Sequence, residues 1–137
     1  MKVKIFFHDI ILFVKLLIVT FTTVPLSSFY WRDTLPSQVQ LSKVVTGTFN
    51  QQFSYKIVYQ TNLNGSYQTL ADSLSTTKNY VLEASPAALE LAANERVTEL
   101  MFIFSTVKGG FGQVEPAYIH GNVLSGLGNS TSIVNIA

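Results

Sequence analysis

Apolar and polar side chains alternate along most of this chain, which is the pattern of half-buried β-strands. The clearest case is the segment 53–60, in which every second residue is aromatic or aliphatic. Its apolar face consists of Phe53, Tyr55, Ile57 and Tyr59. The segment 39–49 has the same period, and Gly47–Gln52 joins the two segments. The pattern therefore predicts two strands connected as a hairpin.

Turn-forming residues separate the alternating segments about every ten residues, as in all-β domains. Asn62-Leu63-Asn64-Gly65 predicts a hairpin turn, because Asn and Gly accept the positive φ that tight turns need. Tyr67–Leu70 should then pair back onto the segment 53–60. Arg96–Val107 is apolar on both faces in its middle, which predicts a central strand. Further strands are expected at 79–83, 116–124 and 133–136.

One segment, Ser85–Ala93, predicts a helix instead of a strand. Ser85 can cap a helix, and Pro86 suits the first helical position because it lacks only an N–H that would have no partner there. The Ala and Leu residues that follow favour helix formation. With about two turns, the helix would connect strands. Together these elements predict an all-β, antiparallel β-sandwich with one short connector helix.

The apolar segment 5–24 supports two interpretations. It could be a signal peptide or membrane anchor, but His8, Asp9 and Lys15 interrupt it. An Asp or Lys at a helix centre costs roughly 2.5–3.5 kcal/mol on insertion scales. Alternatively, the β-branched and aromatic residues of Leu16–Val24 predict a buried strand that ends at Pro25. Both interpretations stay open.

The chain is therefore divided into an apolar N-terminal segment, 1–23, and a β-sandwich module, 24–137. Residues 1–23 are either a degenerate signal or anchor, or the first strands of the sandwich. The module is expected to be truncated at both ends and so to be a fragment of a longer protein.

Composition narrows the functional class. The chain has 137 residues, which suits one domain. Charged residues are 12%, about half the usual share, and this balance is typical of extracellular β-domains. A net charge of +1 without a Lys/Arg cluster excludes an electrostatic footprint for nucleic acid. The absence of Cys excludes disulfides and favours an intracellular or a bacterial surface protein, of which we prefer the second.

No set of residues predicts catalysis, a cofactor or a metal site. His8 and His120 are expected to be packing residues, because two His without Cys do not close a zinc site. Asp33 and Asp72 are isolated carboxylates expected to cap turns. The Gly-rich segment Lys108–Gly112 lacks the Lys-Ser/Thr ending of a phosphate loop and predicts a turn.

Two weaker patterns concern surface chemistry. Phe29, Tyr30 and Trp31 could form an exposed aromatic platform for sugar, with Tyr30 and Trp31 as ligand contacts, but we prefer to place them in the core. The triplets Asn64-Gly65-Ser66 and Asn129-Ser130-Thr131 match the glycosylation acceptor pattern. Such triplets are common by chance.

Several short sequence motifs also occur together along the chain. They are Phe29-Tyr30-Trp31-Arg32-Asp33-Thr34-Leu35-Pro36, Val45-Thr46-Gly47-Thr48-Phe49, Tyr55-Lys56-Ile57-Val58-Tyr59-Gln60-Thr61-Asn62-Leu63, Leu74-Ser75-Thr76-Thr77, Ala84-Ser85-Pro86-Ala87-Ala88-Leu89, Val97-Thr98-Glu99 and Gly110-Phe111. Over 24–124, this combination resembles the conserved-repeat modules of unknown function in Gram-positive cell-surface and wall-anchored adhesin-type proteins. The resemblance implies an immunoglobulin-like β-sandwich without catalytic residues.

The resemblance also implies a location and a role. It makes this chain a non-enzymatic structural or adhesive module, extracellular, with the neighbouring domains of a longer surface protein as partners. Two other hypotheses remain from the residues themselves. One is a small membrane-tethered protein anchored by residues 5–24, and the other is a carbohydrate-binding module that uses Tyr30 and Trp31.

Overall fold

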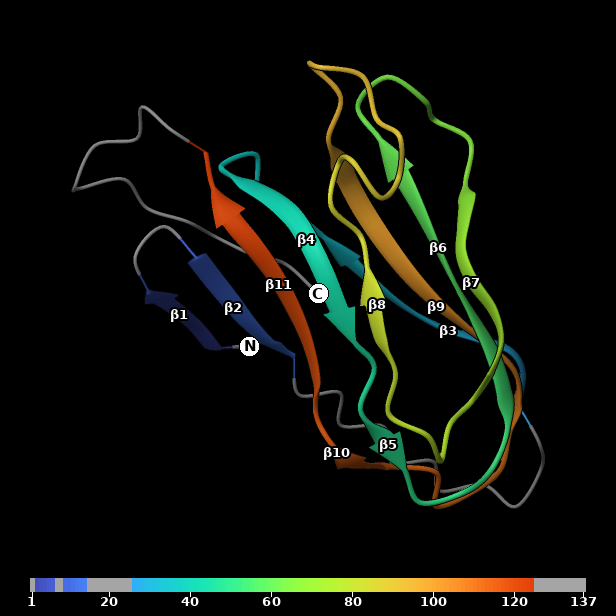
Figure 1. Cartoon of the computed structure of the whole chain (residues 1–137). Coiled ribbons are helices and arrows are strands. Elements are labelled where there is room, and N and C mark those ends of the chain that lie inside the picture. The colour runs from blue at the N-terminus through green and yellow to red at the C-terminus, as the bar shows by residue number, and fades with distance from the viewer. Residues whose placement is uncertain (1, 7–8, 15–25, 125–137) are drawn as a thin grey trace.

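The computed structural model describes residues 2–6, 9–14 and 26–124, and the side chains of 29–124 (Figure 1). The described residues form antiparallel strands and turns. None of them belongs to a helix that could cross a membrane. The predicted strands at Leu16–Val24 and 133–136, together with His8 and Asn129, lie outside the described residues.

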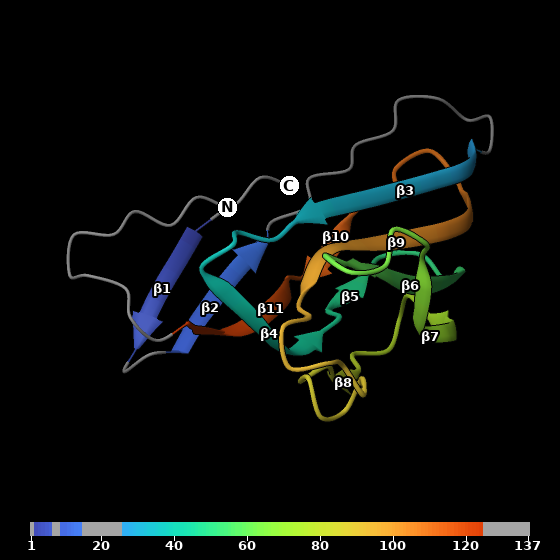
Figure 2. The same cartoon turned by 90° about the horizontal axis from the view of Figure 1, so that it is seen from above.

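Two sheets make up most of the fold. The five-stranded sheet has the order β1 (Lys2–Phe6), β2 (Asp9–Val14), β11 (Ala117–Val123), β4 (Val39–Val45) and β8 (Val81–Glu83). The four-stranded sheet has the order β3 (Leu26–Thr34), β9 (Val97–Val107), β6 (Ser54–Thr61) and β7 (Gln68–Ser75). A short pair, β5 (Thr48–Phe49) with β10 (Gln113–Glu115), stands apart. In both views β1 and β2 lie on the side away from β6 and β7 (Figure 1, Figure 2).

The strand order is that of a jelly-roll sandwich. From β2 onward, with β5 and β10 set aside, successive strands alternate between the two sheets, and only β6 and β7 follow each other in one sheet. An antiparallel β-sandwich is therefore confirmed, and its connections are those of jelly rolls. In an immunoglobulin sandwich the last two strands share a sheet, whereas β9 and β11 lie in different sheets. The immunoglobulin-like arrangement is thus not confirmed.

The predicted hairpin between the segments 39–49 and 53–60 is wrong. Strand β4 lies between β11 and β8, whereas β6 lies between β9 and β7 in the other sheet. Residues 47–52 carry the chain from one sheet to the other. The alternating pattern shows that a strand is half-buried, but both sheets offer an apolar face, so the pattern does not choose the partner.

Buried side chains of both sheets meet in one core. Strand β9 supplies its centre, because Leu100, Phe102 and Phe104 are each at most 1% exposed. Leu41, Val44 and Ile119 contribute from the five-stranded sheet to the same cluster. The prediction of a central strand over Arg96–Val107 is confirmed, since β9 pairs with both β3 and β6.

The connector helix predicted at Ser85–Ala93 is absent, and a single turn takes its place. Ser85 caps as predicted, because its Oγ accepts the Ala88 N–H at 3.2 Å and its carbonyl accepts the Leu89 N–H at 3.0 Å. Glu90 then adopts φ 55°, in the left-handed region, where a right-handed helix cannot continue. The chain reverses there, which allows Leu89 and Leu91 to pack against the core.

A buried threonine ties the turn after β7 to the residues before β6. The Thr76 Oγ1 donates to the Gln51 carbonyl at 2.6 Å and accepts the Phe53 N–H at 2.8 Å. Thr76 is fully buried, and the two hydrogen bonds that its hydroxyl makes are part-buried.

We expect Thr76→Val to lower the free energy of unfolding by about 1–3 kcal/mol, because it leaves the part-buried Gln51 carbonyl and Phe53 N–H without this partner. Urea denaturation measures the change. The exposed Thr69→Val, on β7, should change stability by less than about 0.5 kcal/mol. Equal losses in the two variants would contradict the role of Thr76.

Candidate functional site

The outward side chains of β3, β9, β6 and β7 form a surface that we call the outer face. The register sets these side chains in rows across the strands, because alternate residues of a strand point to the same side. One row is Tyr30, Ile103 and Lys56, and the next is Arg32, Met101 and Val58. A third row contains Thr34, Glu99 and Gln60.

Polar side chains flank an apolar strip on the outer face. Ile103 and Met101 are half-buried at its centre, and Val58 is only 5% exposed although it points away from the core. Tyr30 stands at the β3 end of this strip and is 55% exposed. The outer face thus offers an aromatic ring next to aliphatic side chains, which is an arrangement suited to binding.

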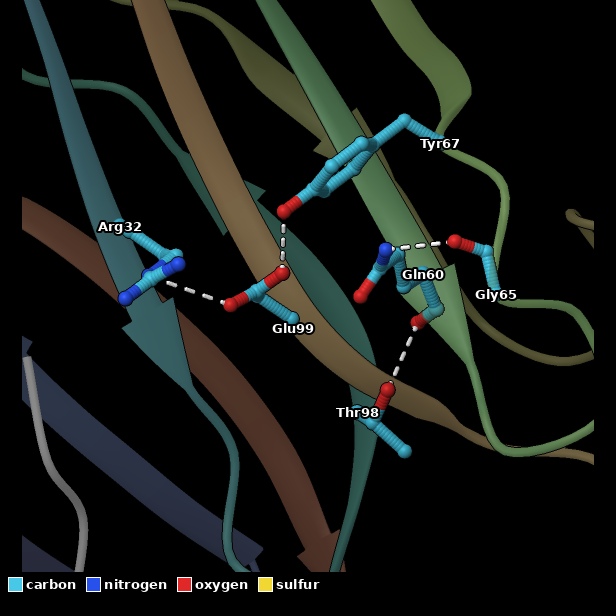
Figure 3. Close-up of polar contacts among 6 residues, drawn as sticks. All are labelled: Arg32, Gln60, Gly65, Tyr67, Thr98 and Glu99. Atoms are coloured by element: carbon cyan, nitrogen blue, oxygen red, sulfur yellow. Dashed lines mark hydrogen bonds and ion pairs between the residues drawn. The ribbon is translucent and has the colours of Figure 1, made fainter.

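One end of the outer face carries an ion pair completed by a tyrosine (Figure 3). The Arg32 Nε lies 3.2 Å from the Glu99 Oε1, and the Tyr67 hydroxyl donates to the Glu99 Oε2 at 2.5 Å. The two oxygens of Glu99 therefore have different partners, on β3 and next to β7. The Arg32 side chain is 54% exposed, so the ion pair contributes little to stability.

The hydrogen bond to Glu99 raises the pKa of Tyr67, with smaller contributions from desolvation and from the negative charge. The folded-state pKa of Tyr67 thus lies above its unfolded value. Stability from this contact is fully present below the ordinary phenol pKa, and it is lost as the pH rises through the folded-state pKa.

We expect Glu99→Gln to lower the pKa of Tyr67, because the acceptor loses its negative charge. An alkaline titration followed by NMR of the tyrosine ring carbons measures this, and Tyr67→Phe identifies the resonance. Glu83→Gln, an exposed substitution on β8, serves as the control. An unchanged Tyr67 titration in Glu99→Gln would contradict the assignment.

The same corner of the outer face holds the loop between β6 and β7 in place. The Gln60 Nε2 donates to the Gly65 carbonyl at 2.6 Å, and the Thr98 Oγ1 donates to the Gln60 carbonyl at 3.3 Å (Figure 3). The predicted turn at Asn62–Gly65, with a strand pairing back onto β6, is confirmed.

The other end of the outer face contains a hollow of about 210 Å³, open to solvent. Its lining consists of Ser54, Tyr55, Lys56, Asp72, Ser73, Ile103 and Ser105. Ser73 has a φ of 55°, which is rare for a residue other than glycine, and the register of β6 with β7 shifts nearby. Irregular strand segments of this kind often lie next to functional sites. The hollow combines hydroxyls, an amine and a carboxylate with the aliphatic side chain of Ile103.

The two candidate ligand residues, Tyr30 and Trp31, do not share a surface. Adjacent residues of a strand point to opposite sides, so Tyr30 lies on the outer face while Trp31 is only 8% exposed in the core. The Trp31 ring packs edge-on against Phe102, with ring centroids 5.0 Å apart. Our preferred placement in the core holds for Trp31 and fails for Tyr30.

The other singled-out residues remain scattered. Asp33, expected to cap a turn, is fully buried within β3. The Asp72 Oδ1 accepts the Ser73 N–H at 2.6 Å, and His120 is half-buried on β11 near Tyr118. Lys108–Gly112 forms the predicted turn, with Gly110 at φ 81°. No group of three His, Cys, Asp or Glu within the described ranges could hold a metal ion.

Comparison with protein-family models, with curated proteins and with solved structures found no match. The candidate site is therefore defined by the geometry of this chain alone. Sequence reasoning missed the cluster of Arg32, Tyr67 and Glu99, which brings together distant parts of the chain. In the sequence, only the alternation within β9 pointed to this cluster, because it places Glu99 on the same side as Met101 and Ile103.

Proposed function

We propose that this chain is a non-enzymatic, adhesive module of a bacterial surface protein and that it contacts its ligand through the outer face. The observation that carries the proposal is Tyr30, a 55% exposed ring placed beside the apolar strip of Met101 and Ile103. An exposed aromatic next to aliphatic side chains supplies contact area at a low cost in conformational entropy.

The polar surroundings of the strip support a ligand without strong net charge. Arg32 is paired with Glu99 at one end, and Lys56 shares the hollow with Asp72 at the other. Positive and negative groups therefore lie side by side on the outer face. They do not form a positive field, which would favour polyanions.

The resemblance to Gram-positive surface modules supports the extracellular location and the neighbouring domains of a longer chain as partners. The strand order weighs against the immunoglobulin-like part of that resemblance. The proposal therefore depends on the outer face more than on the family. Jelly-roll sandwiches also include lectin domains, so the topology is compatible with a role in recognition.

Carbohydrate binding is the second candidate function, and Tyr30 favours it. A sugar ring could stack on Tyr30, while Ser54 and Ser73 line the nearby hollow and carry hydroxyls that can form hydrogen bonds. Trp31 has no part in this version, because it is buried. The membrane-tethered alternative receives no support from the described residues, where β1 and β2 use part of the segment 5–24 in an antiparallel pair.

Retention of the purified chain on Gram-positive cell walls and on a panel of insoluble polysaccharides tests both candidates. We expect Tyr30→Ala to reduce retention about tenfold or more, as for a central contact residue. Val81→Ala, 61% exposed on the other sheet, should bind like the parent. Retention that is unaffected by Tyr30→Ala, or release of soluble sugar by the chain, would refute the proposal.

A further inference from the structure

The loop between β6 and β7 combines an exposed Asn-Gly pair with a fixed side-chain geometry. Asn64 and Gly65 are both exposed, at the tip of a hairpin whose base is closed by mutual backbone hydrogen bonds between Thr61 and Asn64. We infer that Asn64 is a site of spontaneous deamidation through a cyclic imide formed with Gly65. This inference is independent of the proposed ligand and of the outer face.

The first supporting feature is the conformation of the Asn64 side chain. Its Oδ1 accepts the Ser66 N–H at 2.9 Å, which makes an Asx turn. The ring closed by this hydrogen bond contains both reacting atoms, the Asn64 Cγ and the Gly65 backbone nitrogen. The same hydrogen bond draws electron density from the side-chain carbonyl and makes its carbon a better electrophile. The turn therefore folds the electrophile over the peptide that attacks it.

The second feature is the freedom of the attacking peptide. The Gly65 N–H has no acceptor within the described part of the chain, so its nitrogen is not held by another contact. Gly65 has no side chain, and even a Cβ placed there would meet no atom within 4 Å. Ring closure at this peptide therefore meets little steric resistance.

The chemistry is balanced with water as the only co-reactant. The deprotonated Gly65 nitrogen attacks the Asn64 Cγ and forms a C–N bond, the bond from Cγ to Nδ2 breaks, and ammonia leaves. Water then adds to one of the two imide carbonyls and opens the ring. The product is an ordinary aspartyl residue at position 64 when the new C–N bond breaks, or an isoaspartyl linkage when the original peptide bond breaks.

Asn62 lies in the same loop and provides an internal comparison. Its Nδ2 donates to the Asn94 carbonyl at 3.0 Å, and its Oδ1 accepts the Arg96 N–H at 2.8 Å. Its successor is Leu63, which carries a branched side chain. Asn62 therefore has a side chain fixed at both ends and a hindered nucleophile, although it is exposed like Asn64.

The reaction would change the charge next to the outer face. Each conversion replaces a neutral side-chain amide by a carboxylate and so lowers the net charge of the chain, which is +1, by one unit. Position 64 precedes the Gly65 carbonyl that Gln60 holds (Figure 3). An isoaspartyl linkage adds a methylene to the backbone at this point and should weaken that contact.

The test is incubation of the full chain in mildly alkaline buffer, followed by peptide mapping with mass spectrometry and by ion-exchange chromatography. We expect conversion at Asn64 to be at least about tenfold faster than at Asn62, because only Asn64 precedes a residue without Cβ. Hydroxylamine, which cleaves cyclic imides, should cut the chain between positions 64 and 65.

Gly65→Ala is the matched variant. It should slow conversion at position 64 about tenfold or more while leaving the melting temperature at or above the parent's, because the added Cβ has open space. A comparison with the urea-unfolded chain isolates the effect of the fold, and the native chain should react at least as fast. Equal rates at Asn62 and Asn64, no effect of Gly65→Ala, or faster conversion in urea would each overturn the inference.

Discussion

Replacing Phe104 by Ala should lower the free energy of unfolding by about 3–5 kcal/mol, the usual range for a buried phenylalanine. Phe104 is fully buried on the central strand β9. Its ring lies within ring-contact distance of Phe29, Phe49, Tyr55 and Phe111, with centroids 5.2 to 5.8 Å apart. Removal of the ring therefore leaves a cavity in the place where strands β3, β5, β6 and β9 meet.

A loss of this size is a large fraction of the roughly 5–15 kcal/mol by which a native domain is stable. Urea denaturation followed by tryptophan fluorescence measures it, because Trp31 packs in the same core. Tyr30→Ala is the control, since it removes an exposed ring from the outer face and should cost less than about 0.5 kcal/mol. A similar loss in both variants would show that Phe104 is not at the centre of the core.

The positions of most strands could be predicted from the sequence, and their partners could not. Alternation indicates β4 and β6, because the burial of one face imposes a period of two on any half-buried strand. Apolar residues on both faces indicate β9 as a central strand. Pairing depends on contacts between residues far apart in sequence. The crossing from β4 to β6 illustrates this, because nothing in Gly47–Gln52 distinguishes a hairpin from a connection between sheets.

Backbone conformation differs from the expectation in two loops. The Ala and Leu content of Ser85–Ala93 favoured a helix, but the packing of Leu89 and Leu91 requires a reversal at Glu90. The turn predicted at Asn62–Gly65 forms, but Gly65 does not adopt the positive φ that an Asn-Gly pair accepts. Local propensity is a weak signal that tertiary packing overrides.

The candidate site was only partly visible in the sequence. The aromatic motif around Trp31 indicates β3 as a candidate site, and strand alternation then places Tyr30 and Trp31 on opposite sides. The pairing of Trp31 with Phe102 on β9 places Trp31 toward the core, and the pairing of Tyr30 with Ile103 places Tyr30 on the outer face. Tyr67 reaches Glu99 only because the loop after β6 folds back, and no spacing rule indicates this contact.

Gly47→Ala should destabilise the fold by about 3 kcal/mol or more, because two separate costs add at this position. Gly47 has a φ of 74°, which an alanine adopts with strain. An added Cβ would also lie 2.8 Å from the Pro116 carbonyl carbon and oxygen, and it would overlap the Glu115 carbonyl. These are backbone atoms where β10 leads into β11, so they cannot rotate away as a side chain would.

Gly65→Ala is the control for Gly47→Ala, because both variants add one methyl group to a glycine. Position 65 has open space and no positive φ, so the same change should be neutral or stabilise the fold by up to about 1 kcal/mol. Thermal denaturation of the two variants side by side gives the comparison. Equal melting temperatures would mean that residues 47 and 115–116 do not approach closely. A large loss confined to Gly47→Ala would instead support this close approach, on which the crossing between the two sheets depends.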